Sequence, residues 1–171
     1  MSVTGSYTFN KVSNAFTPNG GLGNRTVTIG LTGTTTLTQE WSSIISAAAN
    51  DWNTSGAGVN ITTTTLGPQQ HIITVDWFSS TLVPGVGHCG KSPSGNVVAT
   101  SSIIRINLNH ISADTLPRRS TVAHEMAHLL WLGDKPYETE ANISLMNYNR
   151  NRTTIFEPQT YDINNVRWVY S

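Results

Sequence analysis

The feature that most constrains this chain is the stretch 121–134, which reads TVAHEMAHLLWLGD. His124 and His128 are four residues apart, so on a helix their imidazoles lie one above the other, and Glu125 lies beside that face. Two imidazoles that converge in this way can bind one zinc ion, and a catalytic zinc site needs a third protein ligand. The sequence therefore predicts a helix that carries a zinc site, with Glu125 placed to act as a general base towards water.

Chance is a weak explanation of this spacing. A shuffled chain with the same five His and five Glu would contain H-E-x-x-H with a probability of about 0.004. No Gly or Pro interrupts residues 120–132, which favours a helix, and apolar residues surround the histidines. These apolar residues are Val122, Ala123, Met126, Ala127, Leu129 and Leu130. The alternative is a core helix whose histidines are only hydrogen-bonded, and it leaves the spacing unexplained.

The same stretch resembles the long metzincin motif H-E-x-x-H-x-x-G-x-x-H/D. The third metal ligand of that motif stands ten residues after the first histidine, which is Asp134 here, and an aspartate there resembles the snapalysin type. Residues 144–148, SLMNY, are similar to the Met-turn beneath the metal in this clan. Residues 158–170 resemble the closing helix of bacterial matrixin-like proteases. The resemblance implies a zinc metalloprotease in which His124, His128 and Asp134 are the metal ligands.

The predicted Met-turn suggests two further roles. The tyrosine of this turn approaches the zinc in some members of the clan, so the resemblance implies that Tyr148 donates a hydrogen bond to the developing oxyanion or binds the metal in the resting enzyme. The alternative for Tyr148 is a packing residue. Met146 is expected to pack beneath the ligands without coordinating the metal.

One position departs from the family pattern. The clan has a glycine three residues after the second histidine, where the backbone leaves the helix, and this chain has Trp131 there. A positive φ is uncommon for a tryptophan, so we expect a longer helix that ends at Gly133. If Asp134 were displaced as a result, Glu138 or Glu140 would be the substitute ligand.

Composition limits the classes of partner. The formal net charge is zero and only 12% of the residues are charged, so the sequence predicts no nucleic-acid partner and no anionic membrane surface. We expect a monomer with a protein or peptide substrate. The N-terminus lacks the charged and apolar regions of a signal peptide. Because the resemblance is to secreted proteases, we expect a secreted protein whose signal was removed.

The length of 171 residues suits a single catalytic domain, with an upper part of about 1–133 and a lower part of about 134–171. Periodicity predicts strands at 26–31, 59–65 and 71–78, one or two more within 97–107, and a helix at 39–52. The turn-rich residues 18–24 are expected to form a loop. Together with the resemblance, this predicts an α+β fold with a twisted mixed sheet of about five strands, two helices and a terminal helix, and an edge strand within 82–107.

The sequence leaves three functional hypotheses. The first is a zinc endopeptidase that cleaves extended polypeptides, with one catalytic zinc ion. The second is an inactive binding module with the same fold. The third is another H-E-x-x-H zinc amidase, which would use Cys89 as a ligand, although the sequence around Cys89 does not match that type. A structural calcium ion is compatible with such a domain, but no spacing indicates its ligands.

Overall fold

The computed structural model describes residues 21–67, 69–77, 79, 85–89, 98–99, 101–135 and 143–171. The strands are β1 (Gly21–Leu22), β2 (Thr26–Thr32), β3 (Asn60–Thr64), β4 (His71–Asp76), β5 (Gly85–Cys89), β6 (Val98–Ala99) and β7 (Ser102–Asn107). The helices are α1 (Thr35–Thr54), a single 3-10 turn (Leu108–His110), α2 (Thr115–Leu129) and α3 (Thr160–Val169).

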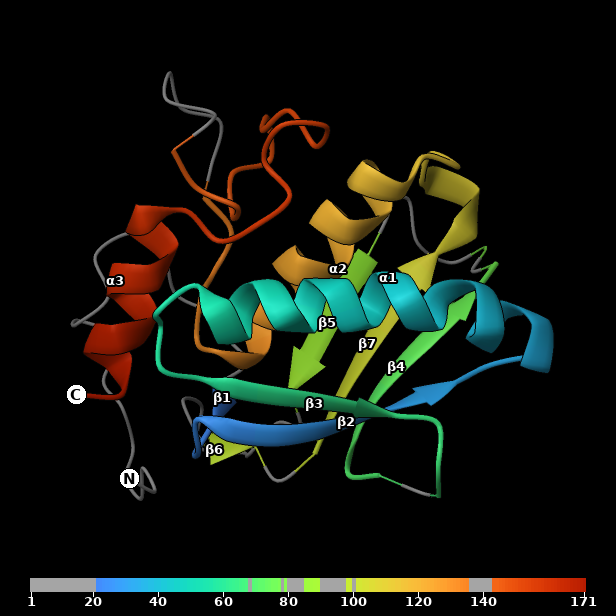
Figure 1. Ribbon diagram of the computed structural model, residues 1–171, viewed down its shortest axis with the longest axis horizontal. Coiled ribbons are helices and arrows are strands. Elements are labelled where there is room, and N and C mark those ends of the chain that lie inside the picture. The colour runs from blue at the N-terminus through green and yellow to red at the C-terminus, as the bar shows by residue number, and fades with distance from the viewer. Residues whose placement is uncertain are drawn as a thin grey trace.

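A five-stranded mixed sheet forms the base of the molecule, in the order β3-β2-β4-β7-β5 (Figure 1). Neighbouring strands are parallel except for β5, which runs antiparallel to β7. Strand β5 lies at one edge of this sheet, as the predicted edge strand should. A second, two-stranded sheet pairs β1 with β6 in parallel. The predicted α+β fold with a mixed sheet of about five strands is therefore confirmed.

Helix α1 packs its apolar face on the sheet and against α2. Its first turn is capped by the Thr34 hydroxyl, which accepts a hydrogen bond from the backbone N–H of Leu37 at 3.4 Å. Trp41, Ile45 and Trp52 recur at helical spacing and are fully buried. The helix extends beyond the predicted 39–52 at both ends, because periodicity locates a buried face better than the exposed ends of a helix.

Helix α2 is buried from Ser120 to Leu129, where only His128 is partly exposed. The indole Nε1 of Trp52 on α1 donates a hydrogen bond to the carbonyl oxygen of Ala123 at 3.0 Å. The six apolar residues around the histidines are all buried, as predicted. Polar groups on such a helix need partners, because an unpaired polar group costs free energy when it is removed from water.

Helix α3 lies apart from α1 and α2 in the view of Figure 1, and it confirms the predicted terminal helix. Its Arg167 Nε donates a hydrogen bond to the carbonyl of Gly56, just past the end of α1, at 2.7 Å. Strand β1 lies where we expected a loop. No helix within the described ranges is long and apolar enough to cross a membrane.

Candidate metal centre

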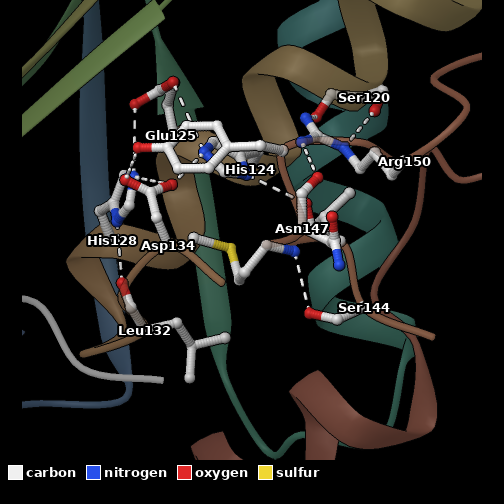
Figure 2. Close-up of polar contacts among 12 residues, drawn as sticks. Ser120, His124, Glu125, His128, Leu132, Asp134, Ser144, Asn147 and Arg150 are labelled. Carbon is white, nitrogen blue, oxygen red and sulfur yellow. Dashed lines mark hydrogen bonds and ion pairs between the residues drawn. The ribbon is translucent and has the colours of Figure 1, made fainter. Parts of the chain in front are cut away.

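Helix α2 brings the two histidines together from successive turns (Figure 2). Their ring centroids are 5.0 Å apart and the ring planes are inclined by 82°. Both side chains are largely buried. The spacing of four residues therefore places two imidazoles side by side, as the sequence predicted.

Backbone carbonyls fix the orientation of both rings. His124 Nδ1 lies 3.0 Å from the carbonyl oxygen of Leu145, and His128 Nδ1 lies 2.8 Å from that of Leu132. A carbonyl oxygen can only accept, so each Nδ1 carries the proton and donates. In a neutral imidazole the Nε2 atom then has a free lone pair, and the two lone pairs are available to a cation.

The helix ends in a Schellman motif, which corrects our expectation for this segment. Helix α2 stops at Leu129, and Trp131 itself adopts a φ of 70°. The N–H of Trp131 donates to the carbonyl of His128 at 3.3 Å, and the N–H of Leu132 donates to that of Ala127 at 3.1 Å. The predicted extension to Gly133 is therefore wrong. Trp131 has the left-handed conformation that the glycine of the motif would adopt.

Contacts with the N-terminal strand hold Trp131 in this conformation. The left-handed region costs about 1–2 kcal/mol for a residue with a Cβ atom, so other interactions must offset the strain. The indole Nε1 donates a hydrogen bond to the carbonyl oxygen of Leu22 at 2.9 Å, and the ring lies against Gly21, where no side chain would fit. These partners lie more than a hundred residues away in the sequence, so a pattern confined to α2 could not reveal them.

The Schellman turn places the carboxylate of Asp134 beside the two histidines. Asp134 Oδ1 lies 3.0 Å from His124 Nε2 and 3.6 Å from His128 Nε2. It is a buried oxygen without a hydrogen-bond partner, whereas Oδ2 accepts a hydrogen bond from the hydroxyl of Tyr148 at 2.7 Å. Glu138 and Glu140, the predicted substitutes, lie outside the described residues.

The protonation states of this cluster suit a cation. Burial is the main reason that the pKa of His124 falls to about 4, and the nearby charge of Arg150 lowers it further. Burial alone would raise the pKa of Asp134. In the acid range where Asp134 titrates, however, His124 is protonated, and its hydrogen bond and the charges of both histidines outweigh burial and lower the pKa to about 2. At neutral pH a neutral imidazole therefore faces an ionised carboxylate, the forms in which these side chains bind metals.

Glu125 lies beside the histidines, and only 4% of its surface is exposed. Its Oε1 is 4.0 Å from His124 Nε2 and its Oε2 is 3.9 Å from His128 Nε2. His124, Glu125 and His128 thus form a compact group that could also hold an ion. Asp134 Oδ1 lies closer to both Nε2 atoms than the Glu125 oxygens do.

The turn 144–148 lies against this cluster, and α3 holds it in place. The buried carboxylate of Asp162 accepts hydrogen bonds from the Ser144 hydroxyl at 2.6 Å and from the Leu145 N–H at 2.7 Å. Burial raises the pKa of Asp162, although these hydrogen bonds act in the opposite direction. The carbonyl of Leu145 then orients His124. The sequence predicted only that Asp162 belongs to the closing helix. Its contact with the turn depends on tertiary packing, which the sequence pattern does not show.

Two buried residues connect this turn with its surroundings. Met146 is fully buried, as expected of a packing residue, and its carbonyl accepts a hydrogen bond from the N–H of Lys135 at 2.9 Å. Arg150 is buried and donates to the hydroxyl of Ser120 on α2 at 3.1 Å and to the carbonyl of Asn147 at 3.1 Å. Burial lowers its pKa to about 9, and the charge of Arg152 lowers it further. Nothing in the sequence pattern indicated Arg150, because a lone arginine in a loop usually lies at the surface.

Two of the remaining histidines, His71 and His110, lie outside the cluster. His71 is half-buried and its Nδ1 lies 2.9 Å from the hydroxyl of Ser102, while burial lowers its pKa. His110 is exposed at the end of the 3-10 turn. These positions agree with a structural or solvent-facing role. The side chains of His88 and Cys89 lie outside the described part of the structure.

The sheet, the two helices and the buried cluster define a metzincin-like fold. The structure of myroilysin aligns with a TM-score of 0.59 over 91% of this chain and 98% of that chain, at 14% sequence identity. High choriolytic enzyme 1, a hatching-enzyme zinc protease from the medaka fish Oryzias latipes, aligns with a TM-score of 0.52 over 88% of this chain and 92% of that chain, at 12% identity. No family model and no curated protein matches the sequence.

Proposed function

We propose that this protein is a zinc-dependent endopeptidase. The observation that carries the proposal is the convergence of three acceptors, namely the Nε2 atoms of His124 and His128 and the Oδ1 of Asp134. Lone pairs that face one another at 3.0 Å repel unless a proton or a cation lies between them, and burial keeps the His124 ring neutral. Two imidazoles and one carboxylate are a set of ligands that suits zinc.

The residues present fit such an ion. Asp134 Oδ1 is a buried oxygen without a hydrogen-bond partner. The Nδ1 atom of each imidazole donates to a backbone carbonyl, an arrangement that commonly orients a metal-binding histidine. Zinc at this position would polarise a substrate carbonyl and lower the pKa of a water molecule. The chain's own residues supply the remaining steps.

In this mechanism Glu125 is the general base. Its carboxylate accepts a proton from the attacking water and later transfers it to the nitrogen of the leaving amine, so the peptide bond breaks and a carboxylic acid and an amine form. Tyr148 donates a hydrogen bond to Asp134 Oδ2, and we assign it a hydrogen bond to the developing oxyanion once its hydroxyl turns from Asp134. The low exposure of Glu125 limits competing contacts with bulk water.

An extended polypeptide is the proposed substrate. Strand β5 lies at the edge of the sheet on the side of α2, and its first residue lies against Glu125. Main-chain pairing with an edge strand gives affinity with little demand on sequence. We further propose that residues 1–171 act as one secreted, monomeric catalytic domain, in which the part before about 134 and the part after it flank the metal.

Three variants test the proposal through zinc content and cleavage of an unfolded protein such as casein. His128→Ala is expected to lose zinc and activity, and Asp134→Ala to bind zinc at least about tenfold more weakly. Glu125→Gln, which keeps the shape of the side chain, should retain zinc and lose activity. Asp76→Ala, an exposed carboxylate at the end of β4, is the matched control for Asp134→Ala and should behave as the wild type.

The same experiments separate the rival hypotheses. Bound zinc without cleavage, and without any effect of Glu125→Gln, would favour a binding module. Loss of the metal when Cys89 is labelled would favour an amidase that uses this thiol. Full proteolysis by Glu125→Gln would show that the general base is misassigned.

A further inference from the structure

Strand β5 passes unusually close to the side chain of Glu125. Gly85, the first residue of the strand, pairs with Ile106 of the neighbouring strand β7. A Cβ atom at position 85 would lie 2.6 Å from Glu125 Oε1, 2.8 Å from its Cγ and 2.9 Å from its Cδ. These separations are far shorter than van der Waals contact, so only a residue without a side chain leaves Glu125 where it is.

The backbone at this position does not itself require glycine. Among the described glycines, Gly33, Gly56, Gly58 and Gly67 have a positive φ, and Gly85 does not. An alanine could therefore adopt the same backbone conformation without strain. Room for the Glu125 carboxylate is the feature that sets position 85 apart.

Glu125 is confined between this strand and the two histidines. Its carboxylate oxygens lie 4.0 Å from His124 Nε2 and 3.9 Å from His128 Nε2 on the other side, and the residue is almost fully buried. A methyl group at position 85 would push the carboxylate away from β5 and towards these nitrogens. The displaced carboxylate would then compete for the space in which a water must lie if Glu125 is to accept its proton.

We propose that Gly85 is a positioning residue, which sets the distance between the Glu125 carboxylate and the metal-binding nitrogens. The proposal rests on the proposed function, because it assigns Gly85 a role through the general base. In this role Gly85 contacts neither the metal ligands nor the reacting bond of the substrate. It acts by being small.

The first test is Gly85→Ala. We expect zinc content equal to that of the wild type, kcat lower by at least about 100-fold, and little change in KM, because a displacement of about 1 Å in a catalytic group costs this much. The visible spectrum of the Co(II)-substituted protein should change as well, since the carboxylate moves towards the metal. Gly30→Ala is the matched control. A Cβ atom there would lie 2.7 Å from Cγ of Gln69, a comparable crowding far from the site, and activity and spectrum should stay as in the wild type.

The second test asks whether Gly85 acts through Glu125. Glu125→Asp shortens the side chain by one methylene, so Gly85→Ala/Glu125→Asp should be at least as active as Gly85→Ala alone. Independent losses that multiply would overturn the proposal. Thermal unfolding of the zinc-free protein gives a readout that does not need activity. Any destabilisation by Gly85→Ala should vanish in the Glu125→Ala background, where the colliding atoms are absent, and its persistence there would also overturn the proposal.

The positioning role of Gly85 and the proposed function can fail separately. Wild-type kcat and an unchanged Co(II) spectrum in Gly85→Ala would overturn the positioning role, while an inactive Glu125→Gln would leave the proposed function intact. Full activity of Glu125→Gln would overturn the general base, and with it the role of Gly85.

Discussion

Two turns support the candidate metal centre, and they are built differently. In the turn 130–134 the carbonyl of Leu132 accepts a hydrogen bond from His128. In the turn 144–148 the carbonyl of Leu145 accepts one from His124. The first turn is joined to the helix that carries the histidine, only four residues further along the chain. The second comes from a segment 21 residues away and needs a partner from α3.

The difference shows where each histidine obtains its rigidity. The first turn is closed by backbone hydrogen bonds of the Schellman motif, and a strained Trp131 completes it. The second turn is held by the buried carboxylate of Asp162. The orientation of His128 therefore depends on local geometry and on the tertiary contacts of Trp131, and that of His124 depends on the packing of α3. Four predictions separate these two kinds of support.

The largest effect is expected at Trp131, in the first turn. Trp131→Ala should lower the free energy of unfolding by about 4 kcal/mol, because a buried tryptophan and its hydrogen bond to Leu22 are lost. Trp131→Gly loses the same contacts but escapes the cost of the left-handed conformation, so it should be the more stable of the two by about 1 kcal/mol. Denaturant unfolding measures both values.

Trp77→Ala is the control for this comparison, since Trp77 is 61% exposed and its loss should change stability little. If Trp131→Gly were less stable than Trp131→Ala, the strain assigned to this turn would be refuted.

The second largest effect is expected from acidification, which should lower the free energy of unfolding through His124. Its pKa is 6.5 in a free chain and about 4 in the folded protein, so between these values the unfolded chain binds more protons than the folded one. The stability of the zinc-free protein should therefore fall by about 3 kcal/mol as the pH falls from 6.5 to 4. The lowered pKa of Asp134 adds a further loss below pH 3.8. Thermal unfolding at a series of pH values measures the slope.

In His124→Asn this slope should become flatter, while in His110→Asn, which changes an exposed histidine, it should stay the same. An unchanged slope in His124→Asn would mean that another group causes the acid lability.

Asp162→Asn tests the second turn with a smaller change. The amide replaces one acceptor oxygen by a donor that faces an N–H or O–H, so we expect a loss of about 2 kcal/mol in stability. Because Leu145 is then held less firmly, zinc affinity should fall by about tenfold. Zinc titration with a competing chelator measures this change. Asn164→Ala, on the exposed face of α3, should leave the affinity as it is, and equal affinities in the two variants would contradict the role of α3.

The smallest effect is expected at Tyr148, which joins the two turns. Tyr148→Phe removes the hydrogen bond to Asp134 Oδ2 at the edge of the site, so zinc affinity should fall by about fivefold, equivalent to about 1 kcal/mol. Tyr161→Phe keeps its ring against Lys135 Nζ and serves as the control. A larger loss in kcat than in zinc affinity would support the predicted contact of Tyr148 with the oxyanion.

Much of the fold was predictable because its signals are local. The alternation in β2 and the helical spacing of Trp41, Ile45 and Trp52 each follow from burial of one face of a single element. The position of β5 at the sheet edge followed from the resemblance. The short strand β1 was missed, because a strand of two residues has no period to detect and exists only through its pairing with β6.

The site divides in the same way. The spacing of His124 and His128 is a property of any helix, so the sequence by itself placed both rings on one face and Glu125 beside them. The position of Asp134 was different. The sequence suggested that a tryptophan at 131 would extend the helix, because local preference opposes a positive φ there.

In the tertiary structure Trp131 nevertheless adopts the positive φ, because the contacts of its indole with Gly21 and Leu22 offset the conformational free energy that this backbone conformation costs. The tertiary structure also decided the tautomers of both histidines, through carbonyls that the sequence cannot assign, and the distance between β5 and Glu125. Covalent spacing along one helix fixes which side chains share a face. Contacts between distant segments fix how those side chains are oriented, since only they can supply the free energy that local preferences lack.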